Sequence, residues 1–230
     1  MLLSYYEFDE PISFQDGVIN ILVIENPAYM TKIIKELLPS SDEISRFELY
    51  ENDAAFSISD YVDVIVNPFS INLNERDILN KLYAAMKKDA LDEELFLSTN
   101  SFLSEIETNI HKIIERQQSL LELDTPDLIG LFKVLNVRFS VSGSLVENIC
   151  DYMDICSEYR KTKLFIFTNL KSFLTELEII QLYTHINYHK RNVLFIENQQ
   201  RSMLEFEITR IIDENLCEIP ILGHNDNDIY

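Results

Sequence analysis

Residues 161–198 read KTKLFIFTNLKSFLTELEIIQLYTHINYHKRNVLFIEN and hold two apolar runs on either side of a helical segment. The runs are 164–167 and 193–196, and neither contains a charge. Runs this short and this apolar are typical of strands buried on both faces, as in a parallel sheet covered by helices. Between them, Thr175 and Glu178 form a capping-box pattern at the start of a helix. We therefore expect a right-handed strand–helix–strand unit at the centre of an α/β fold.

The chain as a whole has the composition of a folded protein. It has 230 residues, of which 47% are hydrophobic, enough for one large domain or two modest ones. No apolar run approaches the roughly 18 residues that span a bilayer, and the first residues lack the basic segment of a secretory signal. Cys150, Cys156 and Cys217 are odd in number and show no CxxC spacing, which is typical of reduced thiols. We expect a cytoplasmic protein without membrane contact.

Strand patterns occupy the first and last parts of the chain, and the middle is helical. The clearest early strand is Val18–Ile24, followed by Asn26 as a helix N-cap and Pro27 at the first helical position. Further strands are expected at 2–6, on a sheet edge, and at 47–50, 54–58, 62–66, 208–212 and 216–219. The predicted division is an α/β head domain at residues 1–67 and 160–230, with a mostly α-helical leg domain at 68–159 inserted in it.

Within the predicted leg, apolar residues recur at intervals of three and four, as on the buried face of a helix. Asn74 is the expected N-cap of a first helix, and a long helix is expected over about 93–121. Asp124 is expected to start the next helix and Ser144 a later one, with a brief strand at 139–141 between them.

A strand that leads into a helix is also found in nucleotide-binding folds, but this sequence lacks their phosphate-binding residues. Phosphate loops use glycine, because backbone N–H groups must converge without obstruction by Cβ. None of the four glycines opens a GxxxxGK[ST] or GxGxxG loop. Glu25 lies where a phosphate would need hydrogen-bond donors. The sequence therefore argues against NTP hydrolysis.

Two histidines, His185 and His189, lie four residues apart near the predicted end of the helix within 161–198. This spacing can supply half of a metal site, but the sequence shows no third ligand. The alternative is a solvated helix end, where the helix dipole favours a charged histidine. The sequence favours that alternative, and no set of residues demands an enzyme.

Four acidic residues lie around the junction between two predicted helices of the leg. They are Glu115, Glu122, Asp124 and Asp127. Closely spaced carboxylates supply the oxygen ligands that calcium prefers, although this spacing is not that of an EF-hand. The alternative is local, because Asp124 and Asp127 also suit the start of a helix and Glu122 suits a solvated surface.

The leg also contains candidate phosphate contacts. They are Lys87, Lys88, Lys133 and Arg138. Lysine and arginine neutralise phosphates through counterion release, without reading bases. The net charge of −20 argues against broad, non-specific nucleic-acid binding but does not exclude a local basic stripe. The alternative for these four residues is an ordinary charged surface.

Several segments, taken in order and spacing, resemble the short-form adaptation protein of type II-A CRISPR systems. They are residues 9–12, 62–67, 131–137, 163–169, 173–175, 193–197 and 213–214. The resemblance covers nearly the whole chain, and it depends on the ordered set rather than on one diagnostic motif.

The resemblance implies an α/β head, similar to P-loop ATPase cores without the nucleotide-binding loop, and a helical leg. It implies a homotetrameric ring that encloses double-stranded DNA, is lined by basic residues and is stabilised by calcium. The implied role is spacer acquisition alongside the CRISPR integrase proteins and the effector nuclease, without catalytic activity. Glu122 and Asp124 fall in the family's acidic calcium segment. Lys133 and Arg138 fall where its basic residues recur.

This chain departs from the family pattern at two positions of the acidic segment. Gln118 and Leu120 stand where relatives can carry acids, which leaves a weaker calcium site, a shifted ion or no calcium as alternatives. Two other functions stay open on the residues alone. One is a degenerate NTPase-like adaptor that binds proteins and not DNA, which the net charge of −20 suggests. The other is a metal-dependent nuclease that uses Glu122 and Asp124.

Overall fold

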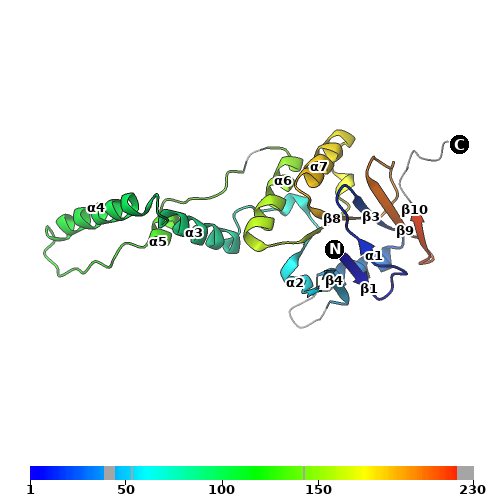
Figure 1. Cartoon of the computed structure of the whole chain (residues 1–230), viewed down its shortest axis with the longest axis horizontal. Coiled ribbons are helices and arrows are strands. Elements are labelled where there is room, and N and C mark those ends of the chain that lie inside the picture. The colour runs from blue at the N-terminus through cyan, green and yellow to red at the C-terminus, as the bar shows by residue number, and fades with distance from the viewer. Residues whose placement is uncertain (39–44, 53, 142, 222–230) are drawn as a thin grey trace. The chain divides into compact units, whose positions relative to one another are not determined.

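The computed structural model describes residues 1–38, 45–52, 54–141 and 143–221 (Figure 1). The chain forms two compact units, one of Met1–Asn72 with Ser142–Tyr230 and one of Leu73–Val141. Residues 143–159, which the sequence analysis assigns to the leg, belong to the first unit. The physical reason is that helix α6 (Leu145–Ile155) packs against helix α7 (Glu176–Tyr188), which belongs to the same unit.

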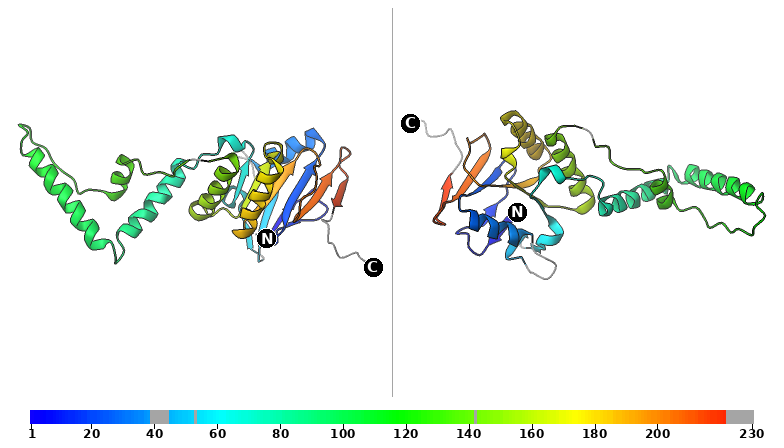
Figure 2. Two further views of the ribbon diagram at one scale, coloured as in Figure 1. Left: turned by 90° about the horizontal axis from the view of Figure 1, so that it is seen from above. Right: turned by 180° about the vertical axis from the view of Figure 1, so that it is seen from behind.

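A six-stranded mixed sheet in the order β10-β9-β3-β8-β7-β6 forms the centre of the first unit (Figure 2). Its strands are β3 (Ile19–Ile24), β6 (Val62–Ile65), β7 (Leu164–Thr168), β8 (Asn192–Glu197), β9 (Glu207–Ile212) and β10 (Glu218–Ile221). All neighbouring pairs are parallel except β9 and β10, which pair antiparallel at one edge. The predicted α/β class is therefore confirmed, and β7, α7 and β8 form the predicted strand–helix–strand unit.

Both faces of this sheet are covered. On one face, Leu164 and Ile166 belong to a core that includes helix α1 (Pro27–Leu37). On the other face, the ring of Phe195 lies 5.6 Å from that of Tyr183 on α7. Because successive residues of a strand point to opposite faces, β7 is buried along its whole length.

A second, antiparallel sheet in the order β2-β1-β4-β5 packs on the same core as α1. Its strands are β1 (Leu2–Tyr5), β2 (Ile12–Ser13), β4 (Phe47–Glu51) and β5 (Ala54–Phe56). β1 pairs with both β2 and β4, so the prediction of an edge strand at residues 2–6 is wrong. The reason is that Leu3 and Tyr5 are buried in the shared core, which holds β1 inside its sheet.

The helix starts of the first unit follow their sequence signals. Asn26 Oδ1 accepts two backbone N–H groups at 3.0 and 3.1 Å, and Pro27 opens α1. Ser144 and Thr175 form complete capping boxes at the starts of α6 and α7. These three predicted N-caps are confirmed. At the turn after β3, the Asn26 side chain takes up the N–H groups that a phosphate would need, which agrees with the missing nucleotide loop.

Short helical elements complete the first unit. They are α2 (Ile58–Tyr61), the 3₁₀ turns η1 (Pro68–Ser70) and η3 (Leu170–Ser172), and the π-helical turn η2 (Cys156–Arg160). The strand predicted at 54–58 is shorter than expected. β5 ends at Phe56, and α2 begins at Ile58.

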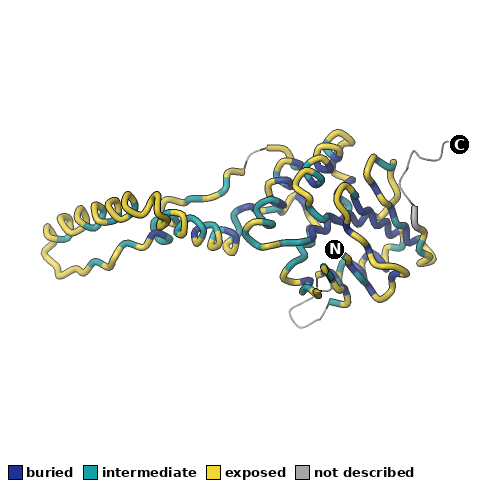
Figure 3. The backbone as a smooth tube through the Cα atoms, viewed as in Figure 1, coloured by how far each residue is buried: buried dark blue, intermediate teal, exposed yellow. Residues whose placement is uncertain are grey.

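The second unit consists of helices α3 (Arg76–Ala90), α4 (Phe96–Ile114) and α5 (Leu128–Val134). Its buried hydrophobic residues are Leu73, Ile78, Tyr83 and Leu128. α4 buries none of its residues (Figure 3). Within the described residues, none of the helices combines the length and apolar character that a membrane crossing requires.

Four predictions for the second unit are wrong in detail. Asn74 does not cap α3, because its side chain exchanges hydrogen bonds with the backbone of Phe139 at 2.8 and 3.1 Å. That pairing takes the place of the strand predicted at 139–141. Asp127 rather than Asp124 caps α5, through a hydrogen bond that its Oδ2 accepts from the Gly130 N–H. The long helix is also shorter than the predicted 93–121.

A buried polar cluster joins η3, α7 and β9 in the first unit. Lys171 Nζ and the Tyr183 hydroxyl both donate to Glu207 Oε1, at 2.5 and 2.7 Å. The side chains of Lys171 and Glu207 are 5% and 2% exposed. Burial, and then the neighbouring carboxylate, raises the pKa of Tyr183, so its hydroxyl remains a donor. A carboxylate at this depth depends on such partners.

We predict that Lys171→Met lowers the free energy of unfolding by about 3–5 kcal/mol, because Glu207 is left buried without its cation. Lys190→Met is the matched control, since Lys190 pairs with Asp16 at 2.8 Å and both side chains are 71% exposed. Exposed pairs of this kind contribute about 0–1 kcal/mol. Urea denaturation followed by circular dichroism measures both variants. If both variants lost the same free energy of unfolding, the buried pair would contribute no more to stability than an exposed pair.

Candidate functional site

The predicted DNA contacts lie on or beside two packed helices of the second unit. They are Lys87 and Lys88 in the last turn of α3, Lys133 in the last turn of α5, and Arg138 just after α5. The helices meet through the rings of Tyr83 and Phe132, whose centroids are 6.3 Å apart. The four basic residues are therefore positioned by one small helix pair.

The chain on either side of Arg138 is hydrogen-bonded to α3 and to the residues just before it. The Tyr83 hydroxyl donates to the Val137 carbonyl at 2.8 Å, and Asn74 bonds to the backbone of Phe139. At its other end α5 begins beside Lys87 of α3, so residues 127–139 run back along that helix. From Asn74 to Lys87, α3 and the turn before it rise by about 20 Å at 1.5 Å per residue. The basic residues are thus distributed along a line rather than gathered at a point.

Lys87 differs from the other three because it already has an acidic partner. Its Nζ lies 3.6 Å from Asp127 Oδ1. In the part of the chain that the structure describes, Lys88, Lys133 and Arg138 form no ion pair, and all three are exposed. Of the four predicted contacts, these three therefore keep a positive charge that no acidic side chain of the described residues neutralises.

The four predicted calcium ligands are exposed and lie on separate segments. Glu115 is the C-cap of α4, Glu122 and Asp124 lie between α4 and α5, and Asp127 caps α5. All four residues are among those that the structure describes. No three of these described carboxylates are close enough together to bind one metal ion.

Asp127 in particular has partners that compete with calcium. The hydrogen bond from the Gly130 N–H lowers the pKa of Asp127, and the Lys87 ammonium adds to this effect. A cation bound to the same carboxylate would be repelled by Lys87. Among the described residues of one chain, the four predicted ligands therefore do not meet at a common point, and Asp127 has the local role of a helix cap.

A row of apolar side chains on and just before α4 is uncovered. Leu95, Phe96, Phe102, Ile110 and Ile113 are between 37% and 54% exposed. Their spacing places them along one stretch of helix surface, as the sequence predicts, but the expected cover is missing in the described residues. Exposed apolar rows of this length mark interaction surfaces.

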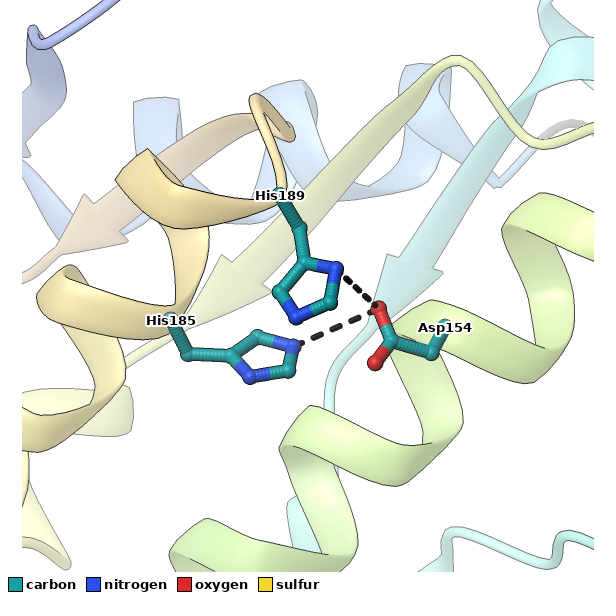
Figure 4. A group of neighbouring side chains, drawn as sticks. All are labelled: Asp154, His185 and His189. Carbon is teal, nitrogen blue, oxygen red and sulfur yellow. Dashed lines mark ion pairs between the residues drawn. The ribbon is translucent and has the colours of Figure 1, made fainter.

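The structure also brings together a cluster that sequence reasoning missed. Asp154 of α6 lies beside His185 and His189 at the end of α7 (Figure 4). Burial lowers the pKa of His185, so the expectation of a solvated, charged histidine is wrong for this residue. No local pattern could have identified Asp154, because only the packing of α6 on α7 places it there.

Comparisons with known proteins identify the family. The family model described as CRISPR-associated protein (Cas_Csn2) matches residues 40–216. The chain is 21% identical over 200 residues to the CRISPR-associated protein Csn2 of Streptococcus agalactiae, covering 85% of this chain and 88% of that protein. It is also 21% identical over 221 residues to the protein of that name from Enterococcus faecalis, covering 94% and 96%.

Solved structures align more loosely. One of them, an ATP-binding cassette of an ABC transporter, aligns with a TM-score of 0.44 and 12% identity, over 94% of this chain and 88% of that chain. A likeness at this level supports no inference about nucleotide binding. The family match spans well over half of the chain, and the predicted resemblance to the CRISPR adaptation protein is confirmed. The chain belongs to the Cas_Csn2 family of CRISPR-associated proteins.

Proposed function

We propose that this chain acts in CRISPR spacer acquisition as a ring of four copies that encloses the ends of double-stranded DNA. The ring contacts phosphates without reading bases and catalyses no reaction. It works in the cytoplasm beside the CRISPR integrase proteins and the effector nuclease. Membership of the Cas_Csn2 family supports the role in CRISPR adaptation.

The single observation that carries the proposed assembly is the uncovered apolar row of α4. Burial of apolar surface contributes about 25 cal/mol per Å², so a face of this kind favours association. A second copy of the chain is the simplest cover, because identical faces complement each other through symmetry. The small core of the second unit supports the same conclusion, since a unit with few buried residues gains most from a partner.

The proposed DNA contact is supported by Lys88, Lys133 and Arg138, which are exposed and without acidic partners among the described residues. Their distribution along α3 and α5 suits a phosphate backbone, which presents charge along a line. A ring that turns this surface inward would also explain how a chain of net charge −20 approaches DNA.

An adaptor that binds proteins and not DNA is the second candidate. Two observations favour it, the net charge of −20 and the pairing of Lys87 with Asp127. The charge-reversal experiment that follows separates the two functions.

We predict that Lys133→Glu with Arg138→Glu weakens duplex binding at least tenfold, because two phosphate contacts per copy become repulsive. Lys35→Glu with Lys190→Glu is the control, since it makes the same change in net charge at exposed positions of the first unit. Band-shift titrations with both double variants measure the effect. If binding survives the first pair of changes while the assembly stays intact, the assigned DNA surface is wrong.

Enclosure predicts a dependence on DNA ends. Linear duplex should bind, whereas a covalently closed circle of the same sequence should not, because only a free end can thread a closed ring. Affinity for linear duplex should fall steeply as salt rises, since each phosphate contact releases counterions. Linearising the circle with a single cut is the control and should restore binding. Equal binding to both forms, or no dependence on salt, would contradict enclosure.

We predict that the solution mass is that of a tetramer and that Ile113→Glu, in the exposed row of α4, reduces it. A charge buried at the contact between copies would be unpaired. Thr108→Glu is the matched control on the same helix. Stabilisation of the ring by calcium is tested by repeating the mass measurement with a chelator. A calcium site that one chain does not form alone would need ligands from more than one copy, so the chelator should then loosen the tetramer. A monomer under all conditions would exclude the ring.

A further inference from the structure

We propose that Asp154, His185 and His189 bind a divalent transition-metal ion of the zinc class in the first unit of the chain. The proposal does not depend on DNA binding or on the assembly, because all three residues belong to the first unit of one chain. It concerns a different place and a different ligand chemistry from the calcium expected in the leg.

The distances between the candidate ligand atoms suit a small ion (Figure 4). Asp154 Oδ1 lies 3.3 Å from His185 Nε2 and 3.8 Å from His189 Nδ1. Each of the three residues offers a ligand atom that lies within 4.8 Å of a ligand atom of each of the others. Zinc takes nitrogen and oxygen ligands at 2.0–2.2 Å, so neighbouring ligand atoms of a tetrahedral site are roughly 3.3–3.5 Å apart. The ion fits between the three side chains after small rotations.

The fold holds these side chains in place from two helices. His185 and His189 are four residues apart, which puts them on the same side of the helix end, with ring centroids 4.3 Å apart. Asp154 lies in the last turn of α6, which packs on α7. Arg191 donates a hydrogen bond to Asp154 Oδ1 at 2.9 Å and so fixes the carboxylate. Metal ligands are commonly oriented by second hydrogen bonds of this kind.

One buried atom of the cluster has no satisfactory partner in the protein. His185 Nε2 is buried and forms no well-aligned hydrogen bond. It nevertheless faces the Asp154 carboxylate at 3.3 Å, as Figure 4 shows. Buried polar atoms are almost always paired, and an ion is one of the partners that explain an exception. A cation between the nitrogen and the carboxylate would satisfy both.

The ligand types select the class of ion. Imidazole nitrogen suits zinc, copper, nickel and iron, whereas calcium and magnesium prefer oxygen. Arg191 places a positive charge on the same carboxylate, which lowers the affinity for any cation. Because a carboxylate oxygen has two lone pairs, Asp154 can bind the ion and keep its bond to Arg191. The site is therefore one of moderate affinity.

Three protein ligands leave a fourth position for water. His185 also lines a surface pocket of about 640 Å³, together with Cys150, Gln181 and Tyr188. The ion would link α6 to α7 across this part of the first unit. Its expected role is to stabilise the packing of the two helices, because an ion that binds only the folded state raises its stability.

The test uses the whole chain, freed of any affinity tag and stripped of metal with a chelator. Titration calorimetry with zinc chloride should show one ion per chain, and the melting temperature should rise by several degrees. Cobalt(II) in place of zinc should give the absorption of a tetrahedral site. An excess of calcium should displace neither ion.

His189→Gln and Asp154→Asn should each weaken zinc binding at least tenfold and abolish the cobalt absorption. His111→Gln is the matched control, because His111 is exposed on α4 and belongs to the other unit. Circular dichroism of the metal-free variants shows whether they fold, and His189, whose side chain is 35% exposed, is the variant least disturbing to the core. Equal binding by His111→Gln and His189→Gln would overturn the proposal, as would a wild-type chain that zinc does not stabilise.

Discussion

The burial of β7 and β8 on both faces is the constraint from which the rest of the first unit follows. The apolar runs of these strands, 164–167 and 193–196, have no polar side chain on either face and need cover on both sides. Helices α6 and α7 supply it on one face, and α1 with the second sheet supplies it on the other. The chain must therefore return to the head as α6 before it forms β7. This requirement explains why residues 143–159 belong to the first unit although their sequence is helical like that of the leg.

The second unit has a small buried core and a large exposed apolar surface. Its few buried residues hold α3 and α5 together, and α4 keeps its apolar row in water. Polar contacts add to the stability that this small apolar core supplies. The main ones are the hydrogen bonds of Asn74 and Tyr83 to the backbone of residues 137–139. The acidic and basic residues of this unit are partly engaged with each other, as Lys87 and Asp127 show. Residue type alone thus overstates the charge that is available to DNA or calcium.

Local signals in the sequence were reliable because their physics is local. The N-caps Asn26, Ser144 and Thr175 act on N–H groups two or three residues away, and the apolar runs of β7 and β8 need only general cover. Features that depend on distant partners could not be predicted. Asp154 meets His185 only after two helices pack, and β1 becomes a central strand only when Leu3 enters the shared core. The uncovered row of α4 has the pattern of a core helix, since periodicity records apolar spacing and not the presence of a partner.

The position of the leg in the chain has a further consequence. β6 and β7 are parallel neighbours, so the whole of the second unit, with α6, serves as the crossover between them. η1 and α6, the elements on either side of the insertion, touch each other within the first unit. Extra length in a crossover costs little free energy, because the entropy cost of loop closure grows only with the logarithm of length. A change in the length of this module should therefore leave the sheet of the first unit unchanged.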